Sequence, residues 1–76
     1  MGSLQDLIMG VLEKTDKWLS IADIASRISD QEGETYRPKQ IRVSMNTLRY
    51  HKLVDRKIEL NSFGSRVFVF RKNRYQ

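Results

Sequence analysis

The 76-residue chain has room for one hydrophobic core, and we expect residues 1–76 to form a single small domain. It contains no cysteine, which excludes a disulfide framework and a thiolate metal site. No apolar stretch approaches the roughly 18 residues of a membrane span, and no basic-then-apolar signal segment opens the chain, so a cytoplasmic, nucleoid-associated location is expected.

The 14 basic and 9 acidic side chains are unevenly distributed. Residues 1–37 carry four basic and seven acidic groups, a net charge of −3, whereas residues 38–76 carry ten basic and two acidic groups, a net charge of +8. A chain that separates its charge in this way presents one electropositive end, which is typical of proteins that bind polyanions. The alternative is a solvated basic surface that serves only solubility.

The first predicted element is a helix that begins at Leu4 and ends within residues 13–15. Ser3 and Asp6 form a capping box at its start. Its apolar residues recur at the spacing of one helical face: Leu4, Leu7, Ile8, Val11 and Leu12. Gly10 inside this helix costs up to about 1 kcal/mol relative to alanine, which close packing of another element against it would explain.

A short extended stretch, Trp18-Leu19, leads to a second helix. We expect Trp18 in the core, because a lone tryptophan beside leucine in so small a chain is far more often a core residue than a contact residue. Ser20 and Asp23 form a second capping box. The helix presents the apolar face Ile21, Ile24, Ala25 and Ile28 and is expected to end near residue 29 or 30.

A polar loop is predicted over residues 30–37, because this stretch holds three carboxylates and a glycine without apolar periodicity. Pro38 suits the first turn of a third helix, which we expect to extend to about Lys52. Its core face comprises Ile41, Met45 and Leu48. At about 100° per residue, the opposite side carries Lys39, Val43, Asn46 and Tyr50, flanked by Arg42, Thr47 and Arg49.

After Asp55 the apolar period changes from about 3.6 to 2, which predicts strands. Residues 56–60 alternate polar and apolar as in a half-buried strand, and residues 66–70 have strong β propensity. Residues 61–65 form the turn between them, so the two strands make a hairpin. We expect an ordered core over about residues 4–71 and a basic tail over residues 72–76.

The aromatic residues of the hairpin leave alternatives open. Phe63, in the turn, either contacts a partner or folds back onto the hairpin. Phe68 and Phe70 share one strand face and Val67 and Val69 the other, so at least one pair belongs to the core. Two aromatic rings at this spacing also suit a stacking platform for single-stranded nucleic acid, but core packing is the preferred interpretation in so small a domain.

This order of elements resembles the winged helix-turn-helix superfamily over about residues 4–71. Residues 41–56, IRVSMNTLRYHKLVDR, are similar to the end of a family recognition helix, followed by a Leu-Val pair and the basic start of a wing strand. Residues 18–25, WLSIADIA, are similar to the family's entry into its second helix. The resemblance implies an α+β fold in which a three-helix bundle carries a C-terminal β-hairpin wing, in the order helix, short strand, helix, helix, strand, strand.

Two features depart from the family pattern. The predicted loop between the second and third helices has about eight residues, more than the tight turn of the simplest helix-turn-helix proteins, and its acidity should keep it away from phosphates. Lys52 stands where the family often has a glycine, just before the Leu-Val pair. Both departures leave open which operator geometry the protein uses.

The resemblance implies that the third helix enters the major groove of double-stranded DNA, where each base pair shows a distinct hydrogen-bonding pattern. The candidates for base-edge hydrogen bonds are Lys39, Gln40, Arg42 and Asn46, with Val43 for a thymine methyl group and Thr47, Arg49 and Tyr50 for phosphate oxygens. The candidates in the wing and tail are Ser62, Ser65, Arg66, Arg71, Lys72 and Arg74. We therefore expect a small transcriptional regulator that acts by occupying an operator.

Two other functions stay open: a winged-helix module for protein–protein interaction, which Val43, Tyr50 and Phe63 would serve, and a binder of structured RNA. A homodimer on a palindromic site is compatible with the small size of the chain. Catalysis has little support, because His51 is the only histidine and no serine or cysteine is paired with it. We expect no catalytic residue, metal site, cofactor, small-molecule ligand or membrane partner.

Overall fold

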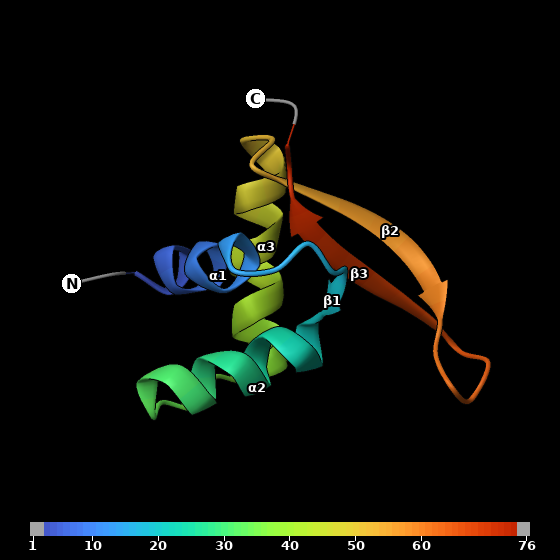
Figure 1. Cartoon of the computed structure of the whole chain (residues 1–76), viewed down its shortest axis with the longest axis horizontal. Coiled ribbons are helices and arrows are strands. Elements are labelled where there is room, and N and C mark those ends of the chain that lie inside the picture. The colour runs from blue at the N-terminus through green and yellow to red at the C-terminus, as the bar shows by residue number, and fades with distance from the viewer. Residues whose placement is uncertain (1–2, 75–76) are drawn as a thin grey trace.

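The computed structural model describes residues 3–74, and this part of the chain forms three helices and a three-stranded antiparallel sheet (Figure 1). In chain order the elements are α1 (Leu4–Glu13), β1 (Leu19–Ser20), α2 (Ile21–Glu32), α3 (Pro38–Tyr50), β2 (Val54–Leu60) and β3 (Arg66–Lys72). This is the order predicted from the sequence, and the α+β fold class is confirmed.

Both predicted capping boxes are present. The Ser3 hydroxyl accepts a hydrogen bond from the Asp6 backbone N–H at 3.2 Å, and the Ser20 hydroxyl accepts one from the Asp23 N–H at 3.1 Å. Each aspartate accepts a bond from the backbone N–H of its serine in return. Because a helix leaves the N–H groups of its first turn unpaired, these bonds fix where α1 and α2 begin.

One hydrophobic core joins the three helices to one end of the sheet. The predicted apolar faces of the helices pack in it, although Leu4, Leu7, Ile21 and Ala25 are only partly buried. Its buried members are Ile8, Val11, Leu12, Leu19, Ile24, Ile28, Ile41, Met45, Leu48, Val54 and Phe70. Trp18 is not among them, in contrast to the prediction, and is only half-buried. Because Leu19 takes the inward position of β1, its neighbour Trp18 lies on the outer side, where the Lys57 Nζ and the Arg71 guanidinium lie 4.6 and 4.5 Å from its ring centroid.

The central strand of the sheet is β3. It pairs with β1 through Leu19↔Phe70 and Ser20↔Val69, and with β2 along seven residue pairs. The hairpin of β2 and β3 extends past the helices (Figure 1), and Ile58 and Leu60 keep 54% and 69% of their surface exposed. The alternation predicted that this strand is half-buried. That prediction is wrong for the end of β2 near the turn, because the hairpin projects beyond the helical core there.

Two helix ends differ from the predicted ones. α2 continues to Glu32 because its last residues lie on the surface and need no apolar partner, and Gly33 then ends it in the left-handed conformation, φ +70°. The loop before α3 is consequently five residues long rather than eight. α3 ends at Tyr50, and the Leu53 N–H bonds back to the Leu48 carbonyl at 3.0 Å.

The predicted basic tail begins later than expected. Lys72 is the last residue of β3, and the Asn73 backbone N–H bonds to the Leu53 carbonyl at 3.0 Å. Arg74 pairs with Asp16 and donates to the Thr15 carbonyl. Residues 72–74 are thus joined to the body of the protein, while Tyr75 and Gln76 lie outside the described residues.

Gly10 is open to substitution by alanine. A Cβ at this position would meet no atom within 4 Å, so the close packing expected from the sequence is absent. We predict that Gly10→Ala raises the free energy of unfolding by up to about 1 kcal/mol, measured by urea denaturation, because alanine is the better helix former. The same change at Gly33, where φ is +70°, should lower it by about 1 kcal/mol. Equal shifts at the two positions would contradict the backbone argument.

Lys52 adopts the left-handed conformation, φ +61°, which glycine reaches without steric cost. A non-glycine residue in this region carries a steric cost of about 1 kcal/mol. We predict that Lys52→Gly stabilises the protein by about 0.5–1 kcal/mol, whereas His51→Gly, at φ −85°, gives no gain. Thermal and urea unfolding of the two variants compare them directly. A destabilised Lys52→Gly protein would show that the lysine side chain outweighs the backbone cost.

Candidate nucleic-acid interface

The outer side of α3 is exposed, as the helical period predicted. Lys39, Arg42, Val43, Asn46 and Tyr50 all face solvent, while Thr47 and Arg49 are half-buried beside them. The inner side holds Ile41, Met45 and Leu48 in the core, which fixes the rotation of the helix. The side chains proposed to read bases therefore lie along one accessible helical face.

Gln40 has a structural role that the sequence analysis missed. Its Oε1 accepts a hydrogen bond from the Arg37 backbone N–H at 2.9 Å, directly before the first residue of α3. This bond satisfies a backbone donor at the start of α3, so the amide oxygen is already engaged and only the amide NH₂ is left to donate to a ligand. The signal was present in the sequence, because glutamine three residues after a helix start is the usual member of a capping box.

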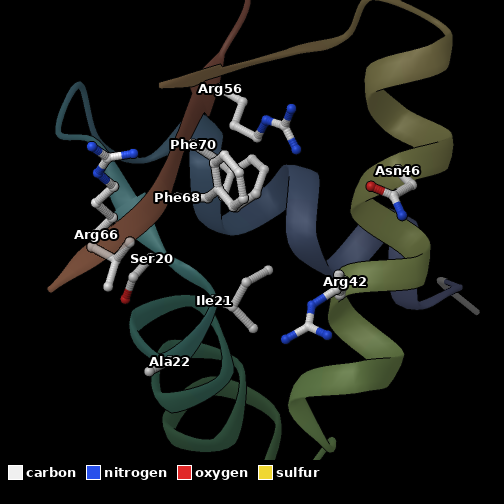
Figure 2. Close-up of a pocket in the computed structure, with 10 residues that line it drawn as sticks. Ser20, Ile21, Ala22, Arg42, Asn46, Arg56, Arg66, Phe68 and Phe70 are labelled. Atoms are coloured by element: carbon white, nitrogen blue, oxygen red, sulfur yellow. The ribbon is translucent and has the colours of Figure 1, made fainter. Parts of the chain in front are cut away.

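A cleft of about 630 Å³ separates α3 from the hairpin (Figure 2). Arg42 and Asn46 point into it from α3, and Arg56 points toward α3 from β2. The rings of Phe68 and Phe70 lie at its back, with Ile21 from the start of α2 below them. Arg66 lies at the far rim, with its guanidinium directed away from α3. The cleft therefore joins the exposed face of α3 to the inner face of the hairpin.

The hairpin sorts its charged residues between its two faces. Strand alternation and register place Arg56, Ile58, Leu60, Arg66, Phe68 and Phe70 on one face, called the inner face here. Of these, Arg56, Arg66, Phe68 and Phe70 line the cleft, and Val67 of β3 also lines it. The outer face carries Asp55, Lys57, Glu59, Val67, Val69 and Arg71, with Lys57 paired to Glu59 at 3.5 Å. Both carboxylates of the hairpin thus lie on the outer face, and the charged groups of the inner face are all basic.

The basic side chains around the cleft have no acidic partners. Within residues 3–74, Arg42, Arg56 and Arg66 form no ion pair with a carboxylate. Arg56 instead stacks on Phe68, with its guanidinium carbon 4.1 Å from the ring centroid. This cation–π contact holds the charge at the cleft without neutralising it. Unpaired arginines beside exposed donors such as Asn46 form a surface suited to an anionic ligand.

Arg56 and Phe68 were missed or misplaced by the sequence analysis. The sequence predicts Arg56 as the first residue of a strand, with no role in a site, and predicts Phe68 as a core residue. In the structure Phe70 and Val69 are buried, one on each face, while Phe68 is 44% exposed. The distinction depends on where the helices stop covering the sheet, which strand periodicity does not reveal.

The turn at the tip of the hairpin is held by Asn61. Its side-chain oxygen accepts hydrogen bonds from the backbone N–H groups of Phe63 and Ser65, both at 2.9 Å. The Asn61 N–H bonds to the Ser65 carbonyl, and Gly64 adopts φ +80° and donates to the Asn61 carbonyl. Ser62 and Ser65 are exposed on this closed turn, and Phe63 does not fold back, since 90% of its surface is exposed.

The three basic residues proposed beyond the wing lie elsewhere. Arg71 is on the outer face beside Trp18, Lys72 pairs with Glu13 of α1 at 3.4 Å, and Arg74 pairs with Asp16. None of the three lines the cleft. These three residues, which contact the N-terminal half, are thus separate from Arg42, Arg56 and Arg66, which line the cleft.

The loop between α2 and α3, residues 33–37, contributes nothing to the cleft, and because α2 includes Asp30 and Glu32 it holds only one acidic residue. Within it, the Tyr36 hydroxyl donates to Glu34 Oε2 at 2.6 Å. This hydrogen bond, together with desolvation and the charges of Glu34 and Glu32, raises the pKa of Tyr36 above 10.0.

Within residues 3–74 no three His, Asp or Glu side chains gather to hold a metal ion. Among the described helices none is long and apolar enough to cross a membrane.

A known structure shares this architecture. A candidate transcriptional regulator from Thermoplasma acidophilum superposes with a TM-score of 0.77 over 92% of this chain and 69% of its own, at 12% sequence identity. With the order of helices and strands, this similarity defines a winged-helix-like α+β fold. No protein-family model matches the sequence, and no curated protein sequence matches it either.

Proposed function

We propose that this chain, as a single winged-helix domain over residues 1–76, binds duplex DNA and acts as a small transcriptional regulator. In this proposal α3 lies in the major groove and the 61–65 turn contacts the backbone or the minor groove. The observation that carries it is the cleft, where α3 and the inner face of the hairpin expose arginines that have no acidic partner among residues 3–74. A surface of this kind gains free energy from contact with phosphates.

The side chains of α3 suit base recognition. Arginine forms bidentate bonds to guanine O6 and N7, and asparagine to adenine N6 and N7, so Arg42 and Asn46 would read bases one helical turn apart. Lys39 and the Gln40 NH₂ would add hydrogen bonds near the start of the helix, and Val43 would meet a thymine methyl group. Thr47, Arg49 and Tyr50 would bind phosphate oxygens farther along it.

The second contact would come from the hairpin. Arg56 and Arg66 carry unpaired charge along its inner face, and Ser62 and Ser65 lie exposed on the turn. Such groups add affinity and orientation more than base selectivity. Arg71, Lys72 and Arg74 have partners elsewhere in the protein, so in this proposal they strengthen the electrostatic field and make no direct DNA contact.

A protein–protein interaction module is the second candidate function. The exposure of Val43, Tyr50 and Phe63 favours it, because exposed apolar side chains often mark an interface. The unpaired arginines beside them favour an anionic partner over a neutral protein surface. Structured RNA has the same phosphate chemistry and is distinguished by competition in the experiment below.

The first experiment is fluorescence anisotropy with random-sequence duplex DNA between low and physiological salt. We expect tight binding whose affinity falls steeply with salt, with a logarithmic slope of about −0.9 per phosphate contact. Single-stranded DNA and structured RNA serve as competitors and should displace the duplex weakly. No duplex binding at low salt would contradict the proposal and direct attention to a protein partner.

The cleft arginines and the paired lysine make a matched comparison. Arg42→Ala and Lys72→Ala each remove one positive charge, but only Arg42 lines the cleft. We predict that Arg42→Ala weakens duplex binding about tenfold, or about 1.4 kcal/mol, while Lys72→Ala changes it less than twofold. Anisotropy at fixed salt measures both. Equal losses would mean that net charge, rather than the cleft, determines affinity.

Sequence preference tests the role of α3 directly. Selection of preferred duplexes from a random pool, repeated with Arg42→Ala and with Asn46→Ala, should show relaxed preference at different base positions for the two variants. Arg66→Ala, at the hairpin, should weaken binding evenly across sequences. If both α3 variants select the wild-type sequence, neither residue reads bases.

A further inference from the structure

The hairpin exposes a row of apolar side chains that the core does not use. Ile58, Leu60 and Phe68 share its inner face with 54%, 69% and 44% of their surface exposed. Phe63 lies in the turn at the tip of the same hairpin, and 90% of its surface is exposed. A chain of 76 residues has few apolar residues to spare, so a contiguous exposed group of them points to a binding surface.

The charges beside this row favour an anionic partner. Leu60 pairs across the hairpin with Arg66, and Ile58 pairs with Phe68, on which Arg56 stacks. Asp55 and Glu59 lie on the opposite face. Apolar groups flanked only by cations match DNA, whose stacked bases are apolar and whose outer edges are phosphates.

Hydrogen bonds hold the backbone of the hairpin tip in one conformation. The two hydrogen bonds to the Asn61 oxygen fix the backbone of residues 63 and 65, so Phe63 projects from a closed turn rather than from a mobile loop. Ordering it on binding would therefore cost little conformational entropy. A single ring at the narrow end of a two-stranded hairpin has the shape of a wedge. It is too small for a stable protein interface, which buries about 800 Å² per partner.

We propose that Phe63 inserts between two stacked base pairs from the minor groove, with Leu60 following it, so that the protein bends and unwinds its DNA. This proposal rests on the proposed function and adds the mode of contact. Apolar wedges of this kind partly unstack one base step and open the groove. Arg66, opposite Leu60 at the base of the turn, would then bind the phosphates of the widened groove.

The test uses a selected duplex with 2-aminopurine placed in turn at each step and a donor–acceptor pair on its two ends. With the wild-type protein we expect a severalfold rise in 2-aminopurine fluorescence at one step and increased energy transfer between the ends. Phe63→Ala should abolish both signals and weaken binding about tenfold, with an unchanged salt slope because no charge is lost. Phe63→Tyr, which keeps the ring, should retain both signals.

Leu53→Ala is the control for loss of an exposed apolar side chain, since Leu53 is exposed and lies outside the cleft. It should keep both signals. Two results would overturn the wedge. In the first, the wild-type protein binds the duplex but produces neither signal. In the second, Phe63→Ala gives the same fluorescence and energy transfer as the wild type. The proposed function survives these outcomes, because it fails only when the wild type binds no duplex.

Discussion

The two residues of β1 join the hairpin to the helices. Leu19 and Ser20 pair with Phe70 and Val69 of β3, and the Ser20 hydroxyl also caps α2. One short segment therefore sets both where α2 begins and how β3 lies against the core. A two-stranded hairpin is marginally stable alone, so this third strand and the buried Phe70 ring hold it in place. Together with Val54 of β2, which is also in the core, this attachment holds the hairpin beside α3, where the cleft lies.

The position of β3 also determines which basic residues have acidic partners. β3 runs back along the body of the protein, which brings Lys72 to Glu13 and Arg74 to Asp16. These exposed pairs contribute little stability individually. Their larger effect is to neutralise the basic residues farthest from the hairpin tip, while Arg42, Arg56 and Arg66 stay without carboxylate partners. The net charge of the C-terminal half is therefore larger than the charge available to a polyanion. The positions of the unpaired arginines matter more than the total.

Local patterns predicted the helices, the capping boxes and the exposed face of α3, because each depends on residues within about one turn of one another. What failed depended on distant neighbours. Ile58 and Leu60 alternate like a half-buried strand, but the alternation does not say whether a helix covers them. Trp18 was assigned to the core on its residue type, although the inward position belongs to Leu19. Arg56 joins the candidate site only through the pairing of β2 with β3 and the place of α3 beside them.

The proposed wedge assigns recognition of the ligand and its deformation to two different parts of the protein. The side chains of α3 are fixed in rotation by Ile41, Met45 and Leu48, so their positions depend on the core. The tip of the hairpin is held by the Asn61 hydrogen bonds and lies beyond the core, so the exposed Phe63 ring is not part of the packing that folds the protein. Substitution of Phe63 should therefore leave stability unchanged, whereas changes at β1 would alter how β3 lies against the core and so the angle between the hairpin and the helices.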